Sequence, residues 1–385
     1  MNIAIITGHF PPSKGGGIAE WALGIARELP KLGHNTSVYV TYQKNRDLSI
    51  HKNEQFDCKP MYGRNWHEFH RFYAGYYMYK ILKDNPDTVF ITTTWGMAKP
   101  FKFLKKRFPE SKMVVVAHGL EITRLQSKKD LKSMTQVISN ADLILSVSRF
   151  TQDEIINRLN KINTDHVRFL PNGVDTDRFY PTSVDENFLK KYNIPTDSDL
   201  ILTLARIIKR KAHDDVIRAM SDIILEFPKA HYVIAGPHRK KDDYLDYLKK
   251  LVLDLSLENH ITFIDFIPDE DLKKIYSASK IYIMPSRTLH ETGDSEGFGI
   301  TFLEANACGC PVIGSHEGGI PDAVEDHVNG LLVPSDSPND ISESVKRLLS
   351  DENYRQNIIK KGMERVSERF TWEKLTIQML KMLDS

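Results

Sequence analysis

Short runs of β-branched and apolar residues alternate with amphipathic stretches along the chain. The first run, Ile3–Thr7, is followed by Ile18–Leu32, in which apolar residues recur at helical spacing. Gly33 ends this predicted helix, and Thr36–Thr41 is the next predicted strand. Further predicted strands are Thr88–Thr94, Met113–Ala117 and Leu143–Val147. Nearly continuous apolar strands separated by helices are typical of a parallel sheet that is covered on both faces.

A second alternation of the same kind begins after Pro171. Its predicted strands are Leu200–Leu204, His231–Ala235, Ile261–Ile264, Ile281–Met284 and Pro311–Gly314. Two successive doubly wound α/β units fit this pattern better than one large sheet. The boundary lies in residues 171–199, which are rich in Pro, Asn, Asp and Gly. We therefore predict an N-terminal domain of residues 1–178, a C-terminal domain of residues 179–370, and a final helix at about 371–385 that packs back on the first domain.

Charge is balanced over the 385 residues but not between the two halves. Lys and Arg number 52 against 51 Asp and Glu, so no overall field favours generic nucleic-acid binding. Residues 1–178 carry 26 basic and 17 acidic side chains, whereas residues 179–385 carry 26 and 34. The basic half includes Phe101–Phe108, which combines aromatic and cationic residues as an interfacial helix does. Contact with an anionic membrane and a solvated basic face are both consistent with it.

A dense aromatic segment also lies in the N-terminal half. Residues 62–79 contain eight Phe, Tyr and Trp residues. Five of them share helical spacing: Phe69, Phe72, Tyr73, Tyr76 and Tyr77. Such a stripe favours core packing over a surface for an acceptor or a lipid.

The cysteines and the N-terminus indicate a cytoplasmic protein. Cys58, Cys308 and Cys310 cannot build a disulfide framework, and the last two lie in an apolar segment. Residues 1–7 lack the basic start and the length of a signal peptide, and no window approaches the ~20 apolar residues of a membrane span. We expect any membrane contact to be peripheral, at the inner face of the cytoplasmic membrane.

Two glycine-containing segments are candidates for anion binding. Pro11–Gly17 follows the first strand and opens the first helix, where backbone amides favour an anion, although three adjacent glycines also occur in plain loops. Its spacing is not GxGxxG, which argues against a dinucleotide oxidoreductase. In the second segment, Glu296 and Glu304 flank a Gly-containing turn into a helix and could hold a sugar nucleotide. By spacing alone, two solvated glutamates at an ordinary helix start are the favoured interpretation.

Residues 296–304 resemble the E-x7-E signature of glycosyltransferase family 4, the retaining nucleotide-sugar transferases of the GT-B fold. The resemblance continues, in order, through residues 117–121, 170–175, 205–211, 234–237, 318–324 and 329–334. Asp322 stands where a glutamate is more usual. The segments around Ser286–Thr288 and Gly293–Ser295 resemble the mannosyltransferase branch that uses GDP-mannose, while a UDP-hexose donor stays open. The resemblance implies two Rossmann-like domains that face each other across a cleft.

The resemblance also implies roles for particular residues on the donor. Arg206 and Lys211 are expected on the diphosphate, with the intervening Lys209 and Arg210 solvated. Gly16 is expected near the diphosphate. Backbone amides for phosphate or sugar are expected from Phe298, Gly299 and Ile300, and groups near the base from Gly236 and Phe266.

Three further residues complete the expected site. His118 is placed beside the transferred sugar, near its 6-hydroxyl. Glu296 is expected to hold sugar hydroxyls or to position the acceptor, and Glu304 to accept hydrogen bonds from the ribose. The Asp175–Asp177 and Asp197–Asp199 triplets are interpreted as turns, so we expect neither a metal nor a cofactor.

The expected reaction is the transfer of a hexose to a lipid-linked or saccharide acceptor with retention of configuration. In a front-face mechanism the β-phosphate takes the acceptor's proton, so no protein general base is assigned. Fixed cations stabilise the charge that builds on the departing phosphate. Two alternatives remain: a soluble transferase that makes a small glycoside, and a catalytically silent sugar-nucleotide-binding protein of the same fold.

Overall fold

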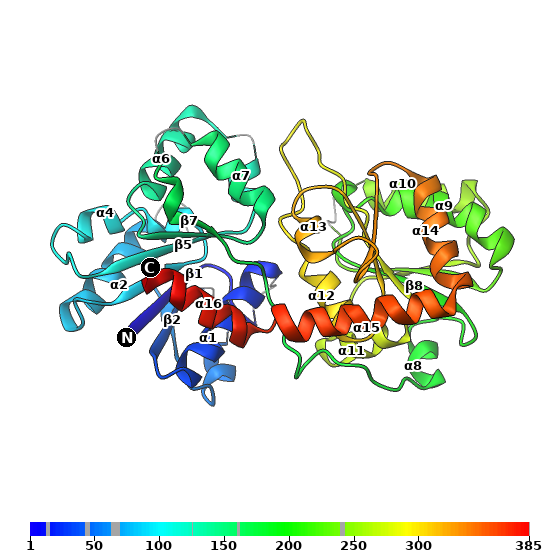
Figure 1. The fold of residues 1–385 in the computed structure, drawn as a ribbon, viewed down its shortest axis with the longest axis horizontal. Helices are drawn as coiled ribbons and strands as arrows, with labels where there is room; N and C mark the ends of the chain where they lie inside the picture. The colour runs from blue at the N-terminus through cyan, green and yellow to red at the C-terminus, as the bar shows by residue number, and fades with distance from the viewer. Residues whose placement is uncertain are drawn as a thin grey trace. The chain divides into compact units, whose positions relative to one another are not determined.

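The computed structural model describes residues 1–12, 16–42, 47–62, 70–124, 126–159, 162–238 and 243–384. The chain forms two compact units (Figure 1): Met1–Gly173 together with Trp372–Ser385, and Val174–Thr371. The first unit ends five residues before the predicted division at 178. The difference arises because the Val174 amide donates to the Phe370 carbonyl at 2.8 Å and Val174 bridges to Thr371, which ties this segment to the second unit.

The N-terminal unit is built on a seven-stranded parallel sheet of order β3-β2-β1-β4-β5-β6-β7. Its strands are β1 (Asn2–Thr7), β2 (Asn35–Thr41), β3 (Asp57–Met61), β4 (Val89–Thr92), β5 (Lys112–Ala117), β6 (Leu143–Ser146) and β7 (Val167–Phe169). Its α-helices are α1 (Gly17–Lys31), α2 (His70–Asp84), α3 (Trp95–Ala98), α4 (Phe101–Leu104), α5 (Leu120–Thr123), α6 (Lys128–Ile138), α7 (Arg149–Arg158) and α16 (Trp372–Asp384). The central strands β1, β4, β5 and β6 are buried almost throughout and largely apolar, as in a sheet covered on both faces, whereas β3 exposes Asp57 and Lys59.

The last helix, α16, packs on α1 within this unit. Gly24 makes room for it, since a Cβ there would lie 2.3 Å from the Trp372 ring. Near the other end of α16, Lys112 Nζ donates to the Leu383 carbonyl at 2.9 Å. The C-terminal segment thus completes the N-terminal unit.

The aromatic stripe of α2 is only in part the core that its spacing predicts: Tyr73 and Tyr77 are half-buried, and Tyr77 packs against the apolar core of the unit. The buried residues of this helix are Ala74, Met78 and Leu82. Phe72 and Tyr76 are 63% and 55% exposed. A helix buries one face, and Ala74, Met78 and Leu82 lie on it, so Phe72 and Tyr76 point outward while Tyr77 still packs against the core. Phe69 lies outside the described residues.

The C-terminal unit contains a six-stranded parallel sheet of order β10-β9-β8-β11-β12-β13. Its strands are β8 (Asp199–Leu204), β9 (Ala230–Ala235), β10 (Ile261–Ile264), β11 (Ile281–Ile283), β12 (Val312–Ser315) and β13 (Gly330–Val333). Its α-helices are α8 (Glu186–Lys191), α9 (His213–Glu226), α10 (Tyr244–Asp254), α11 (Asp269–Ala278), α12 (Ile300–Ala307), α13 (Ile320–Ala323), α14 (Pro338–Ser350) and α15 (Glu352–Arg369). Helices α9, α10 and α14 share one apolar core with the sheet.

The strand order shows where each unit can bind a ligand. Open parallel sheets bind ligands at the carboxyl ends of the two strands where the order reverses. These strands are β1 and β4 in the N-terminal unit, and β8 and β11 in the C-terminal unit. The described part of the chain contains no helix long and apolar enough to cross a membrane.

Candidate functional site

A turn rich in cations follows β8 at this reversal point. Arg206 is exposed, and a short 3-10 helix, η3 (Lys209–Lys211), leads into α9. Arg210 and Lys211 are only 3% and 8% exposed, whereas Lys209 is exposed. The prediction that Arg210 is solvated is therefore wrong. Its guanidinium is buried because a carboxylate from a distant segment pairs with it.

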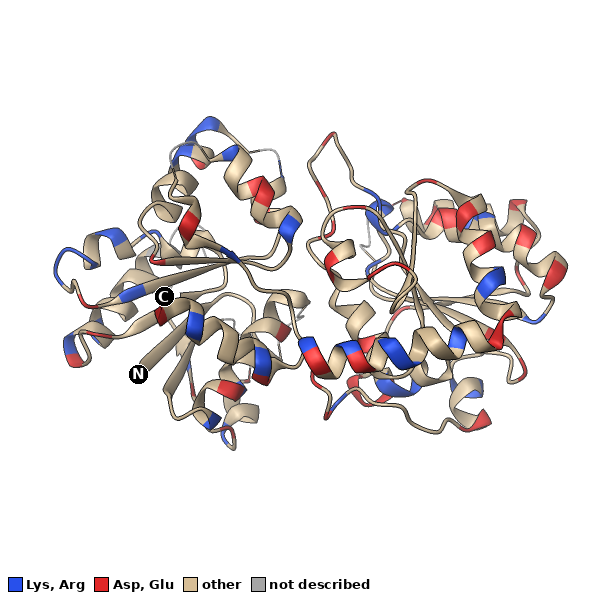
Figure 2. Cartoon of the chain, viewed as in Figure 1, with Lys and Arg blue, Asp and Glu red and all other residues tan. Residues whose placement is uncertain are grey.

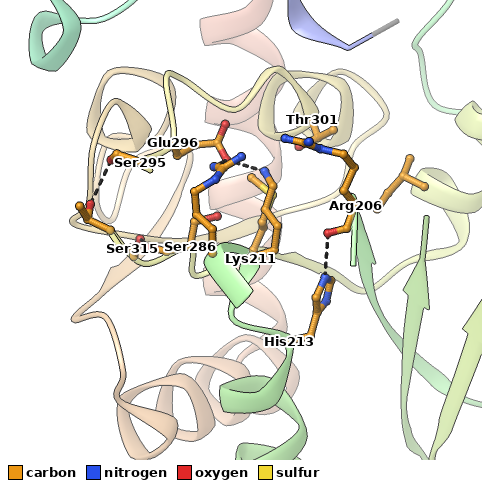
Figure 3. Close-up of polar contacts among 12 residues, drawn as sticks. Arg206, Lys211, His213, Ser286, Ser295, Glu296, Thr301 and Ser315 are labelled. Carbon is orange, nitrogen blue, oxygen red and sulfur yellow. Dashed lines mark hydrogen bonds and ion pairs between the residues drawn. The ribbon is translucent and has the colours of Figure 1, made fainter. Parts of the chain in front are cut away.

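That carboxylate belongs to Glu296, the first glutamate of the E-x7-E segment. Its Oε2 lies 2.6 Å from Arg210 Nη1 and also accepts a hydrogen bond from Lys211 Nζ (Figure 3). All three side chains are at least 87% buried within the unit. Burial opposes ionisation of Glu296, but Arg210 and Lys211 outweigh it and lower its pKa to about 2. Glu296 is therefore an anion between two cations at neutral pH.

Burial acts on Lys211 in the opposite sense. It disfavours the ammonium form and lowers the pKa of Lys211 to about 8, although Glu296 favours the charged form. Arg210 and Arg206 add to the lowering. Arg206, Arg210 and Lys211 together exceed the charge of Glu296 by two. A ligand with two or more negative charges would restore neutrality at this end of the sheet.

The second glutamate, Glu304, lies inside α12. This helix begins after Gly299, whose φ of 89° is in the left-handed region that glycine adopts readily. Ile300 is the first helical residue, and Phe298 is buried. Glu304 is 8% exposed, and its Oε2 accepts a hydrogen bond from Tyr276 Oη at 2.7 Å. No pattern in the sequence indicated Tyr276 as this partner, and the expected contact of Glu304 with a ribose remains a prediction.

The residues expected near a base follow the two neighbouring strands. Gly236 comes directly after β9 with φ 147°, and a Cβ there would lie 2.0 Å from the Ala205 carbonyl oxygen. The Gly236 backbone thus lies directly against the residue before Arg206. Phe266, after β10, is 72% exposed. Their contact with a base stays a prediction.

Gly16 and His118 lie in the N-terminal unit. Gly16 precedes α1 with φ 115°, while residues 13–15 of the same loop lie outside the described residues. His118 follows β5, and Trp21 meets its ring edge-on at a centroid distance of 5.9 Å. Burial, with His9 nearby, lowers the pKa of His118 to about 3, so the ring is neutral. Its Nε2 is buried and has no hydrogen-bond partner within the described chain.

Glu121 is a further titratable group beside His118. Its Oε1 accepts a hydrogen bond from the His118 amide at 2.5 Å. Burial raises the pKa of Glu121 to about 7, although this hydrogen bond favours the carboxylate. Part of the Glu121 population is therefore protonated at neutral pH.

Comparison with known proteins identifies the family. Residues 15–178 match the family model described as Glycosyltransferase Family 4, and residues 184–365 match Glycosyl transferases group 1. The chain belongs to this glycosyltransferase family. The family expected from the resemblance of residues 296–304 to the E-x7-E signature is therefore confirmed.

Relatives match along most of the chain. A GDP-mannose-dependent alpha-(1-6)-phosphatidylinositol monomannoside mannosyltransferase of Mycobacterium tuberculosis is 26% identical, covering 99% of this chain and 97% of its own. A GDP-mannose-dependent monoacylated alpha-(1-6)-phosphatidylinositol monomannoside mannosyltransferase of Corynebacterium glutamicum is 29% identical, covering 77% of each chain.

Solved structures confirm the GT-B fold. Sucrose-phosphate synthase of Thermosynechococcus elongatus superposes with a TM-score of 0.80 at 22% identity, covering 100% of this chain and 98% of its own. Anabaena HepE, solved in complex with UDP and glucose, has the same TM-score at 18% identity. The match covers 100% of this chain and 99% of the HepE chain.

The described residues contain no group of three or more His, Cys, Asp and Glu placed to hold a metal ion. Charge at the candidate site comes instead from Arg206, Arg210, Lys211 and Glu296. That the reaction needs no metal remains a prediction.

Proposed function

We propose that this glycosyltransferase moves mannose from GDP-mannose to a lipid-linked or saccharide acceptor, with retention of configuration and without a metal. The observation that carries the proposal is the buried Arg210–Glu296–Lys211 cluster at the β8 and β11 ends, with Arg206 beside it. Its surplus of positive charge suits a nucleoside diphosphate. The preference for GDP-mannose over a UDP-hexose rests on the names of the two mannosyltransferases above.

The same cations suit the chemistry of the transfer. As the bond between the sugar C1 and the phosphate oxygen breaks, negative charge grows on the leaving diphosphate. Arg206 and Lys211 would stabilise that charge more in the transition state than in the bound donor. The acceptor oxygen bonds to C1 on the same face, and its proton passes to a phosphate oxygen. The neutral His118 would offer its unpartnered Nε2 to a sugar hydroxyl.

The donor site can be tested by isothermal titration calorimetry with GDP, UDP, GDP-mannose and UDP-glucose. We expect all four ligands to bind, with GDP and GDP-mannose binding more tightly than UDP and UDP-glucose. Lys211→Met should lower the affinity about tenfold or more. Lys209→Met removes the same charge from the exposed neighbour and is the matched control, expected to bind like the wild type. If neither diphosphate binds the wild-type protein, the proposed function is wrong.

The acceptor part of the proposal includes contact with an anionic membrane. Helices α2 and α4 adjoin in the N-terminal unit, where a Cβ on Gly75 would lie 2.9 Å from Pro100. We call the following exposed or half-exposed residues the α2–α4 surface: Phe72, Tyr76, Lys80, Lys102, Phe103, Lys106 and Arg107. Figure 2 shows basic positions along α4 and the loop after it. Exposed rings beside cations are the composition of an interfacial contact.

Lys105, in the same basic segment, is held by partners within the N-terminal unit. Its Nζ lies 3.1 Å from Asp142 Oδ1 and donates to the Ser111 carbonyl at 2.5 Å. Phe101, in the same segment, is buried. Part of the predicted interfacial segment thus has a structural role, and only the remaining cations are assigned to the membrane.

A further inference from the structure

A chain of buried hydrogen bonds lies beneath the cationic turn. His213 is the first residue of α9 and is fully buried. Its Nε2 lies 3.3 Å from the Arg206 carbonyl oxygen (Figure 3), and its Nδ1 lies 3.4 Å from Tyr232 Oη. His213 therefore connects the main chain of Arg206 to the interior of the sheet.

The direction of these hydrogen bonds follows from the atoms involved. A carbonyl oxygen can only accept, so His213 Nε2 must carry the proton. Burial lowers the pKa of His213 to about 4, which keeps the ring neutral and leaves Nδ1 without a proton. Nδ1 is then an acceptor that faces the Tyr232 hydroxyl.

The chain continues to the end of β11. Tyr232 Oη lies 2.8 Å from Thr203 Oγ1, which also contacts the Ile283 carbonyl. Because the Tyr232 proton points to Nδ1, the single Thr203 proton is shared between Tyr232 Oη and the Ile283 carbonyl oxygen. Tyr232 and Thr203 are fully buried. The next residue, Met284, places its Sδ 3.1 Å from Lys211 Nζ. The three strands β8, β9 and β11 thus form one rigid support below the turn.

A second anchor holds the other end of the turn. The Arg287 amide donates to the Arg210 carbonyl at 2.9 Å. The Arg287 guanidinium in turn pairs with two carboxylates of α9, at 3.0 Å from Asp214 and 2.5 Å from Asp215. The cationic turn is therefore held at Arg206 by His213 and at Arg210 by Arg287.

We propose that His213 is a positioning residue for the donor diphosphate, which holds the Arg206 main chain so that its exposed guanidinium faces the ligand. This inference rests on the proposed function. Without the Nε2 donor, the Arg206 carbonyl would lose its contact with His213, and any reorientation of that carbonyl would move the residue that bears it. His213 itself does not touch the donor.

Two amide substitutions separate this role from simple packing. In His213→Gln the side-chain amide reaches about as far as Nε2 and can donate to Arg206, whereas in His213→Asn it reaches only about as far as Nδ1. For GDP affinity and for kcat/KM of the donor we expect a loss of about tenfold or more in His213→Asn and of about threefold or less in His213→Gln. The loss should appear in kcat as well as KM, because the Arg206 contact strengthens as charge builds on the diphosphate.

Two results would overturn the inference. Equal losses in both variants would show that His213 serves packing alone, and full GDP affinity in His213→Asn would show that Arg206 needs no anchor. Failure of the wild-type protein to bind GDP or UDP would instead remove the proposed function itself.

A measurement on the wild-type protein guards against misfolded variants. In ¹⁵N-resolved NMR of the histidine rings we expect His213 to be the Nε2–H tautomer, unchanged between pH 5.5 and 8. A proton on Nδ1, or titration within this range, would contradict the anchor directly.

Discussion

Among single residues, Glu296 determines the charge balance of the donor site. One of its oxygens is shared by Arg210 and Lys211, so the unliganded protein carries an internal anion where a diphosphate is proposed to bind. The carboxylate and a ligand phosphate therefore compete for the same two cations.

This competition predicts opposite effects of Glu296→Gln on stability and on GDP binding. Two buried cations lose their anion, so the free energy of unfolding should fall by about 3–5 kcal/mol in urea denaturation. GDP, which carries no sugar, should bind at least about threefold more tightly by calorimetry. Glu291→Gln, on an exposed loop, is the control and should change neither value. Weaker GDP binding in Glu296→Gln would contradict the competition.

The lowered pKa of Lys211 predicts the pH dependence of the donor site. Above about pH 8 the free protein loses the Lys211 proton, and with it one positive charge for the diphosphate. We expect kcat/KM for the donor to fall about tenfold for each pH unit above that pH, as for the loss of a single proton, since kcat/KM reports the free enzyme. GDP binding at pH 8.5 should take up a proton, measured by calorimetry in two buffers of different ionisation enthalpy. A flat kcat/KM from pH 7 to 10 is the contrary result.

Sequence reasoning could name Lys211 and Glu296 but not the arrangement that joins them. Arg210 lies in a Lys-Arg-Lys run, which reads as a solvated surface. Its partner is 86 residues later, and burial of the pair depends on how the β8 and β11 ends meet. No sequence pattern indicated a role for His213, because that role depends on one hydrogen bond to a main-chain carbonyl.

At the scale of elements, the turn after β8 needs close approach of its neighbour β9. A Cβ on Gly236 would lie 2.0 Å from the Ala205 carbonyl oxygen, and φ of 147° is strained for any other residue. Gly236→Ala should therefore lower the free energy of unfolding by at least ~1–3 kcal/mol and weaken GDP binding, as Arg206 moves with Ala205. Urea denaturation measures the free energy of unfolding, and calorimetry measures GDP binding. Gly96→Ala, in an open helical position, is the control; unchanged GDP binding in Gly236→Ala would contradict the close approach.

Strands were easier to predict than helix faces. Ten of the thirteen described strands appear as apolar runs, and their bounds were predicted to within two residues. β3, β7 and β13 were missed; β3 and β7 contain exposed polar residues, and all three are short. In α2, by contrast, the aromatic spacing indicated a face that is only partly buried. The close packing of Gly75 on Pro100 and the burial of Ala74 and Met78 fix that helix instead, and neither is visible in its periodicity.

At the scale of the whole molecule, the excess of basic residues in the N-terminal half predicts selective membrane binding. Lys102→Gln, Lys106→Gln and Arg107→Gln together should release the protein from phosphatidylglycerol vesicles in flotation, since each cation near the surface contributes up to ~1 kcal/mol. Binding by the wild type should weaken as salt shortens the Debye length below ~10 Å. The matched control replaces three exposed lysines of α6, namely Lys128, Lys129 and Lys132.

The two triple variants make the test specific to the α2–α4 surface. An equal loss of flotation in both variants would show that membrane binding depends on the total charge of the unit and not on the α2–α4 surface. Flotation of the α2–α4 variant equal to that of the wild type at low salt would show a solvated basic face. Donor hydrolysis should remain unchanged in both, because the donor cations belong to the other unit.

The proposed function requires transfer from a nucleotide sugar with retention, and proton NMR of GDP-mannose turnover tests it most directly. In the first minutes, before mutarotation, we expect the α-anomer of the released or transferred mannose. The rate in Lys211→Met should be lower by about 100-fold or more, the effect of losing one transition-state charge partner, and in Lys209→Met it should match the wild type. A β-anomer formed first, or no consumption of GDP-mannose or of any UDP-hexose, would contradict the account.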